Sequence, residues 1–260
     1  NNIFKFRDLQ TNLKLSLKNY KIEVSYDGTD LLGWQIQKKG RTVQGDIEAA
    51  LKKIFNQDIS LIGAGRTDSG VHALRQIANF KIESDMNSDT LKDALNGNID
   101  RDIFIGKCEV VNNDFHSRFS AIKREYCYRI ESSYIPFNRN YAWSLDLTNL
   151  DINILHECSK LLLGEHDFTQ LSKKNDDIDN KVCNVFDSNW TINNSSLNYR
   201  IRANRFLHHM VRYLVGVMVE VSKKHLLSVS DFKSMINAEE RKMIFKAPSK
   251  GLYLENIYYE

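Results

Sequence analysis

Residues 63–74, GAGRTDSGVHAL, hold one carboxylate in a glycine-rich segment that follows an apolar strand pattern. Glycine allows positive φ and close approach of the backbone, so a tight turn there can present Asp68 at the end of a strand. Arg66 lies two residues earlier, and a guanidinium nearby favours the ionised form of a carboxylate. A fixed, ionised carboxylate can act as a nucleophile or a general base. The segment predicts a catalytic Asp68; the structural alternative is an aspartate that caps its own turn and pairs with Arg66.

Two nucleotide-binding patterns begin with similar glycines, and both fail here. The dinucleotide-binding pattern G-x-G-x-x-G needs a third glycine at position 68, where this chain has Asp68. A carboxylate at that place would repel a pyrophosphate. The P-loop pattern needs a following Gly-Lys-Ser/Thr, which is absent from the sequence. A nucleotide-dependent oxidoreductase is therefore disfavoured.

The sequence predicts no metal site. His208 and His209 are adjacent, so they do not share a face of the helix expected there, and no third ligand is evident. The four cysteines show no CxxC spacing, which argues against a zinc cluster or a disulfide framework. We expect buried free thiols in a reducing compartment. No apolar run is long enough to span a membrane and no signal-peptide pattern opens the chain, so we expect a cytoplasmic protein.

The charge balance leaves the choice of partner open. The net charge is only +3, but basic residues cluster locally. Such clusters suit contact with nucleic acid, whereas a solvated protein surface is the alternative. The clusters are Lys38-Lys39-Gly40-Arg41, Lys123-Arg124, Lys173-Lys174 and the arginines 200, 202 and 205.

The first half of the chain reads as strands with two helices. Residues 20–28 alternate apolar and polar side chains, as a strand does. Residues 43–55 have helical periodicity, with Thr42 as the expected N-cap. A second helix is expected to be capped by Ser88 and to end near Gly97. Further strands are expected at 58–65, 72–83, 102–111 and 118–132.

The second half has the same mixture of expected strands and helices. A helix is expected to end at Gly164, and residues 181–206 form a hairpin with Asn193-Asn194 in or near its turn. In its second strand, Leu197, Tyr199, Ile201 and Ala203 share one face and Asn198, Arg200, Arg202 and Asn204 the other. A long apolar helix is expected over 206–223, a shorter one begins with the cap pattern Ser228-x-x-Asp231, and the chain closes on a strand at 251–260.

These elements predict an α+β protein in which two halves share a continuous, largely antiparallel sheet. No linker rich in glycine, serine or proline separates the halves. We expect an N-terminal extension over residues 1–19, a first α/β half over 20–125 with the aspartate loop, and a second over 126–260 with the arginine-bearing helix.

Six motifs, in this order along the chain, resemble the TruA family of tRNA pseudouridine synthases over roughly residues 20–259. They are YDGTDLLGWQIQ with RTVQGDIEAAL, GAGRTDSGVHAL, DFHSRFSAIKREYCYRI, GEHDFT, NRFLHHMVRYLVG and APSKGLYLENIYY. The resemblance implies pseudo-symmetric halves around a central active-site cleft and isomerisation of uridine to pseudouridine in tRNA. It further implies targets at tRNA positions 38 to 40 in the anticodon stem-loop, a homodimer, no metal and no cofactor.

The resemblance assigns a role to four residues. Asp68 matches the family's catalytic aspartate, and Arg66 matches the arginine tied to nucleotide flipping. Tyr126 matches the tyrosine that stacks on the target base, and Arg212 matches the arginine that pairs with the carboxylate. Arg212 lies in an apolar helix where an unpaired charge is unfavourable, so it should meet Asp68 across the junction of the halves. Tyr213 replaces an asparagine that is frequent in the family, which puts the substrate position in doubt but not the reaction.

Alternatives stay open at this point. Tyr126 is also consistent with a core tyrosine of a strand, and Trp34 with either RNA stacking or a loop anchor. The competing function from another class is a non-catalytic RNA-binding protein or tRNA-folding chaperone. A pure binder has no need for Asp68, Arg66, Tyr126 and Arg212 together, which favours the enzyme.

Overall fold

The computed structural model describes residues 16–174, 179–193, 195–239 and 242–260. Within them, ten strands form one sheet in the order β4-β1-β3-β10-β5-β9-β8-β7, with β2 pairing β3 and β6 pairing β5. The strands are β1 (Leu17–Tyr26), β2 (Ile62–Gly63), β3 (His72–Glu83), β4 (Ile103–Val111), β5 (Lys123–Glu131), β6 (Trp143–Ser144), β7 (Gly164–Asp167), β8 (Val182–Asn193), β9 (Ser196–Ala203) and β10 (Leu252–Tyr258). The helices are α1 (Val43–Phe55), α2 (Ser88–Asn96), α3 (Ile152–Leu161), α4 (Met210–Ser222) and α5 (Val229–Ile236). The predicted α+β class is confirmed.

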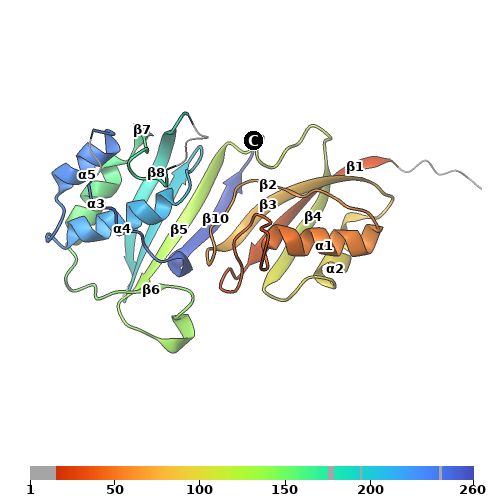
Figure 1. Ribbon diagram of the computed structural model, residues 1–260, viewed down its shortest axis with the longest axis horizontal. Helices are drawn as coiled ribbons and strands as arrows, with labels where there is room; N and C mark the ends of the chain where they lie inside the picture. The colour runs from red at the N-terminus through yellow and green to blue at the C-terminus, as the bar shows by residue number, and fades with distance from the viewer. Residues whose placement is uncertain (1–15, 175–178, 194, 240–241) are drawn as a thin grey trace, which may run out of the picture.

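The C-terminal strand joins the two halves of the sheet. β10 pairs with β3 in parallel through Tyr253 and Leu254, and it pairs with β5 in antiparallel register along most of its length. Figure 1 shows β10 between β5 and β3, with α1 and α2 over one half and α3, α4 and α5 over the other. Apart from the β10–β3 and β5–β6 pairs, neighbouring strands are antiparallel. The predicted continuous, largely antiparallel sheet is therefore present.

The predicted limits of the halves can be placed on this sheet. β1 begins at Leu17, inside the predicted extension 1–19, whose residues 1–15 lie outside the described residues. The predicted boundary between residues 125 and 126 falls inside β5. A single hydrophobic core includes side chains of both halves, so no linker is needed.

Capping side chains set the helix starts. Thr42 accepts a hydrogen bond from the backbone N–H of Gly45, as predicted. Ser228 and Asp231 form the reciprocal capping box expected from their spacing. The prediction for α2 was wrong by one residue: Asn87 caps it, accepting from the N–H of Thr90 at 2.8 Å. Ser88 instead takes the first helical position, because asparagine is at least as good an N-cap as serine.

The β8–β9 hairpin has the predicted division of faces. Alternate residues from Leu197 to Ala203 are buried, whereas Arg200 is exposed on the opposite face. Asn193 ends β8, and Asn194 lies outside the described residues. The arginine face is the one without helices, where Arg200 pairs with Glu255 and Arg202 with Asp187.

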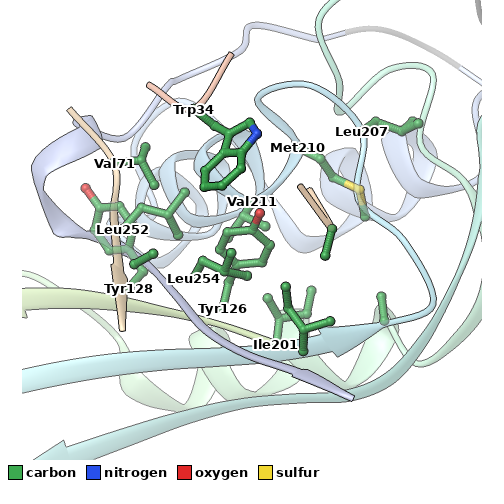
Figure 2. Close-up of a cluster of buried hydrophobic side chains, with 14 of the residues drawn as sticks. Trp34, Val71, Tyr126, Tyr128, Ile201, Leu207, Met210, Val211, Leu252 and Leu254 are labelled. Carbon is green, nitrogen blue, oxygen red and sulfur yellow. The ribbon is translucent and has the colours of Figure 1, made fainter. Parts of the chain in front are cut away.

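The core at the junction combines side chains from both halves. Figure 2 shows Trp34 and Val71 of the first half against Tyr126, Met210 and Val211 of the second. The cysteines of the described chain, Cys108, Cys127, Cys158 and Cys183, are free and buried as predicted. No helix in the described parts is long and apolar enough to cross a membrane.

Helix α4 begins later than predicted. The apolar pattern indicates a start at Phe206, but the helix begins at Met210 after His209, which has φ +63°. A left-handed residue cannot continue an α-helix, so His208 and His209 lie in a separate turn that the N–H of Met210 closes on the carbonyl of Leu207. α3 likewise ends at Leu161, before the predicted Gly164, because Gly164 has φ +94° and starts β7.

A glycine brings α4 close to the segment before β10. A Cβ placed on Gly216 would lie 2.1 Å from the carbonyl oxygen of Phe245, so only glycine fits there. The same segment contributes Ala247, whose N–H bonds the carbonyl of Arg212 at 3.0 Å. Gly216 therefore sets the distance between α4 and the strand that joins the halves.

We expect Gly216→Ala to lower the free energy of unfolding in urea by about 1–3 kcal/mol, because the added methyl group forces the backbone apart. Gly97→Ala is the matched control. A Cβ there would lie 3.4 Å from its nearest neighbour, an ordinary contact, and φ is −77°. That variant should be unchanged or up to about 1 kcal/mol more stable. Equal effects of the two substitutions would contradict the close approach at Gly216.

Candidate active site

The loop that carries Asp68 is held at several points along its backbone. The N–H of Trp34 bonds the carbonyl of Thr67, and the hydroxyl of Tyr26 bonds the Thr67 hydroxyl at 2.8 Å. The Gln76 amide donates to the carbonyl of Gly65 at 2.8 Å. The N–H of Val71 closes the turn onto the carbonyl of Asp68 at 3.1 Å. A carboxylate on such a loop is fixed before any substrate arrives.

The structure explains why two positions of the motif are glycine. Gly70 has φ +76°, a left-handed conformation that glycine adopts without strain. A Cβ on Gly63 would lie 2.4 Å from the indole of Trp34, which packs directly on the loop. Trp34 is only 2 % exposed, so it is a loop anchor and its RNA-stacking alternative is not supported.

Asp68 pairs with Arg212 rather than with Arg66. Nη1 of Arg212 lies 3.0 Å from Oδ2 of Asp68, across 144 residues of sequence, and both side chains are mostly buried. The predicted contact between the halves is therefore present. The structural alternative of an Asp68–Arg66 pair is wrong: Arg66 is exposed and pairs with none of the described residues. The exposed Arg66 side chain is available to a ligand.

Arg212 also forms a hydrogen bond through its Nε atom. Its Nε donates to the carbonyl of Ala247 at 2.9 Å, while the N–H of Ala247 bonds the Arg212 carbonyl. The guanidinium therefore connects α4, the aspartate loop and the segment leading to β10. Because charges are poorly solvated in such surroundings, loss of either partner leaves the other stranded.

Two imidazoles complete the surroundings of Asp68. Nε2 of His208 lies 3.4 Å from Oδ1, and Nε2 of His209 lies 3.5 Å from Oδ2. Burial lowers the pKa of His209 to about 4, so this imidazole is neutral at neutral pH. Burial also lowers the pKa of His208, and the positive charges of Lys173, Lys246 and Arg212 act in the same direction.

Both histidines reach the carboxylate because they precede α4 instead of lying in it. The expectation that these histidines lie in the helix is therefore wrong, and Asp68 supplies the third potential ligand that the sequence did not reveal. Its ligand atom and those of His208 and His209 lie within 4.8 Å of one another, the one such group in the described chain. Arg212 already neutralises this carboxylate, and Lys173 and Lys246 add positive charge. These charges oppose a divalent cation and suit an anionic substrate; the metal-free site stays a prediction.

Tyr126 lies beneath the carboxylate on β5. It is 8 % exposed, and its ring meets the edge of Phe206 with centroids 5.0 Å apart. Figure 2 shows its hydroxyl directed away from the strands, toward Trp34 and Val211. Burial raises the pKa of Tyr126, and the negative charge of Asp68 contributes. The phenol is therefore neutral, and stacking of a base on its ring requires neighbouring side chains to move.

Several residues of the basic clusters form contacts inside the protein. Arg124 donates to the carbonyls of Ala121, Asn204, Ala64 and Arg118. It thus holds the start of the aspartate loop, a role that the Lys-Arg pattern did not reveal. Arg41 pairs with Asp46, Asp100 and Asp102. Arg200 and Arg202 lie on the sheet face away from Asp68.

The sequence of this chain is similar to proteins of a known family. The chain matches the sequence profile described as tRNA pseudouridine synthase over residues 22–120 and 158–260. The chain belongs to the family of tRNA pseudouridine synthases. It is 38 % identical to tRNA pseudouridine synthase A of Brachyspira hyodysenteriae over 94 % of this chain and 99 % of that one. It is 40 % identical to tRNA pseudouridine synthase A of Dictyoglomus thermophilum over 93 % of this chain and 99 % of that one.

Membership of the tRNA pseudouridine synthase family makes the chain an isomerase. The alternative of a non-catalytic RNA-binding protein or folding chaperone is not favoured.

Arg212→Met should lower the free energy of unfolding in urea by about 3 kcal/mol, because Asp68 remains as a buried carboxylate without its partner. Adding Asp68→Asn removes that stranded charge. The double variant should therefore recover about 1 kcal/mol or more of the lost stability, without recovering activity. Strict additivity of the two single changes would show that the residues are not energetically coupled.

Proposed function

We propose that this member of the family isomerises uridine to pseudouridine at tRNA positions 38 to 40, with Asp68 as the essential carboxylate. The observation that supports the proposal most strongly is the setting of Asp68. Arg212 binds Oδ2 of this carboxylate on a loop fixed by backbone hydrogen bonds, and no described residue makes an equally short polar contact with Oδ1. That oxygen can act as a nucleophile or as a base, and both routes use the same carboxylate.

The remaining site residues fit the removal of a base from its stack. A uridine in a helical stem has to leave the stack before its glycosidic bond can be reached. The exposed guanidinium of Arg66 is free to contact the displaced nucleotide or a phosphate next to it. Tyr126 can offer an aromatic surface to the extruded base once neighbouring side chains move, and such stacking contributes about 1–3 kcal/mol per base.

The substrate backbone is expected to lie over the helix-bearing face of the sheet. Lys173 and Lys246 lie close enough to His208, beside Asp68, to lower the pKa of that imidazole, whereas Arg200 is neutralised by Glu255 on the opposite face. Binding should therefore weaken with salt, because phosphate contacts release counterions. We further propose a homodimer, as the TruA resemblance implies, and a cytoplasmic location, with which the free cysteines are consistent.

Incubation of unmodified tRNA transcripts with the protein should place pseudouridine at positions 38 to 40, as read by chemical mapping. Asp68→Asn should lower the single-turnover rate by at least about a hundredfold, because the amide is neither a nucleophile nor a base at neutral pH. Binding of tRNA should be largely retained, since the amide keeps size and polarity. Activity within tenfold of wild type would remove Asp68 from this role.

Two substitutions at Tyr126 separate its ring from its hydroxyl. Tyr126→Leu removes the ring and should reduce the single-turnover rate or the affinity for tRNA by at least about tenfold, the equivalent of roughly 1.4 kcal/mol of stacking. Tyr126→Phe keeps the ring, so its affinity should match the wild type. A loss of turnover in the Phe variant alone would indicate proton transfer by the hydroxyl. Normal rates in both variants would leave Tyr126 as a core residue only.

A further inference from the structure

The oxygen of Asp68 that Arg212 leaves open faces an imidazole with access to solvent. Nε2 of His208 lies 3.4 Å from Oδ1, and the His208 side chain is 46 % exposed. His209, the other imidazole, approaches Oδ2 and is only 14 % exposed. The two histidines therefore differ in the oxygen they meet and in their contact with water.

The reaction requires a proton to leave this site. Uridine and pseudouridine are isomers: the bond from the sugar to N1 breaks, and a bond from the sugar to C5 forms. C5 then loses its hydrogen as a proton, and N1 gains a proton, so the balance is zero. The C5 proton needs an acceptor next to the base and a path out of a pocket where Asp68 is mostly buried.

We propose that His208 relays the C5 proton from Asp68 to bulk water. Oδ1 of Asp68 first accepts the proton from C5, and Nε2 of His208 then takes it from the carboxyl group. The imidazolium gives a proton to water, and N1 receives one from solvent. This relay rests on the proposed role of Asp68, but it holds whether Asp68 earlier attacks the nucleotide or removes a sugar proton, because both routes end with a free carboxylate.

The surroundings of His208 suit each step. Imidazole is ordinarily a stronger base than a carboxylate, so it can accept a proton from a carboxyl group. The charges that face His208 are Asp68 from the aspartate loop, Arg212 from α4, Lys173 and Lys246, with His209 in ring contact. Burial and the three cations lower the pKa of His208, although the charge of Asp68 opposes them, so the imidazole is neutral before the transfer and the imidazolium gives up its proton more readily than an ordinary one.

His209 does not meet the same requirements. Its pKa of about 4 makes it a weak acceptor, and its Nδ1 is buried without a hydrogen-bond partner. Its left-handed backbone, with φ +63°, instead ends the turn that brings His208 to the carboxylate. We assign His209 a positioning role.

The test compares His208→Gln with wild type in single and in multiple turnover. Asp68 accepts the C5 proton in both proteins, but without the relay the carboxyl group loses that proton slowly before the next cycle. Multiple turnover of His208→Gln should therefore fall by at least about tenfold more than single turnover. Added imidazole should restore part of the multiple-turnover rate by replacing the missing base.

His209→Asn is the matched control, since asparagine tolerates the left-handed backbone at this position. It should show neither a selective loss of multiple turnover nor rescue by imidazole. Equal losses of single and multiple turnover in His208→Gln would overturn the relay. Activity of Asp68→Asn would instead contradict the proposed function, whereas an inactive Asp68→Asn beside an unaffected His208→Gln contradicts the relay alone.

Discussion

The ion pair between Asp68 and Arg212 is the contact on which the candidate site depends. Arg212 belongs to an apolar helix in which almost every side chain is buried, and an unpaired guanidinium is strongly unfavourable there. Its partner comes from a loop of the other half, 144 residues away in sequence. The pair therefore couples correct packing of α4 to the position of the carboxylate. If one of these groups is placed incorrectly, the other remains as a buried charge without a partner.

The C-terminal segment makes this coupling possible. Ala247 binds Arg212 through its carbonyl and its N–H, and Ser249 lies against Gly70 of the aspartate loop. Five residues after Ala247 the chain enters β10, which pairs with β3 and β5. The same stretch thus closes the sheet and supports both members of the ion pair. Stability at the junction and geometry at the site have one structural origin.

Several arginines of the basic clusters bind acidic side chains or carbonyls of the protein itself, so these clusters do not by themselves indicate an RNA-binding surface. Arg41 pairs with three aspartates, Arg124 is satisfied by backbone carbonyls, and Arg200 pairs with two glutamates. These side chains hold the fold together, although they stand in the clusters that suggested RNA binding. The positive charges nearest to Asp68 and His208 are those of Arg212, Lys173 and Lys246. Only Lys173 of these belongs to a basic cluster of the sequence.

The sequence by itself determined the elements, because caps and alternation act over a few residues. Thr42 and the Ser228–Asp231 box start their helices as predicted, and the apolar face of β9 follows directly from period two. It also determined that Arg212 needs a buried acidic partner, since the cost of an unpaired charge does not depend on topology. These local and energetic constraints were sufficient for the α+β class, whereas the resemblance to the family identified Asp68 as the partner of Arg212.

Only the tertiary structure decided which groups surround the carboxylate. The apolar pattern continues through Phe206, so it cannot reveal that His209 turns left-handed and ends the helix early. That one backbone conformation brings His208 and His209 to Asp68. The sequence also could not predict what Arg66 and Arg124 contact. With the same local sequence, a charged side chain can lie in solvent, pair with a carboxylate or donate to a carbonyl. Such choices depend on contacts between distant segments, which exist only after the halves have packed.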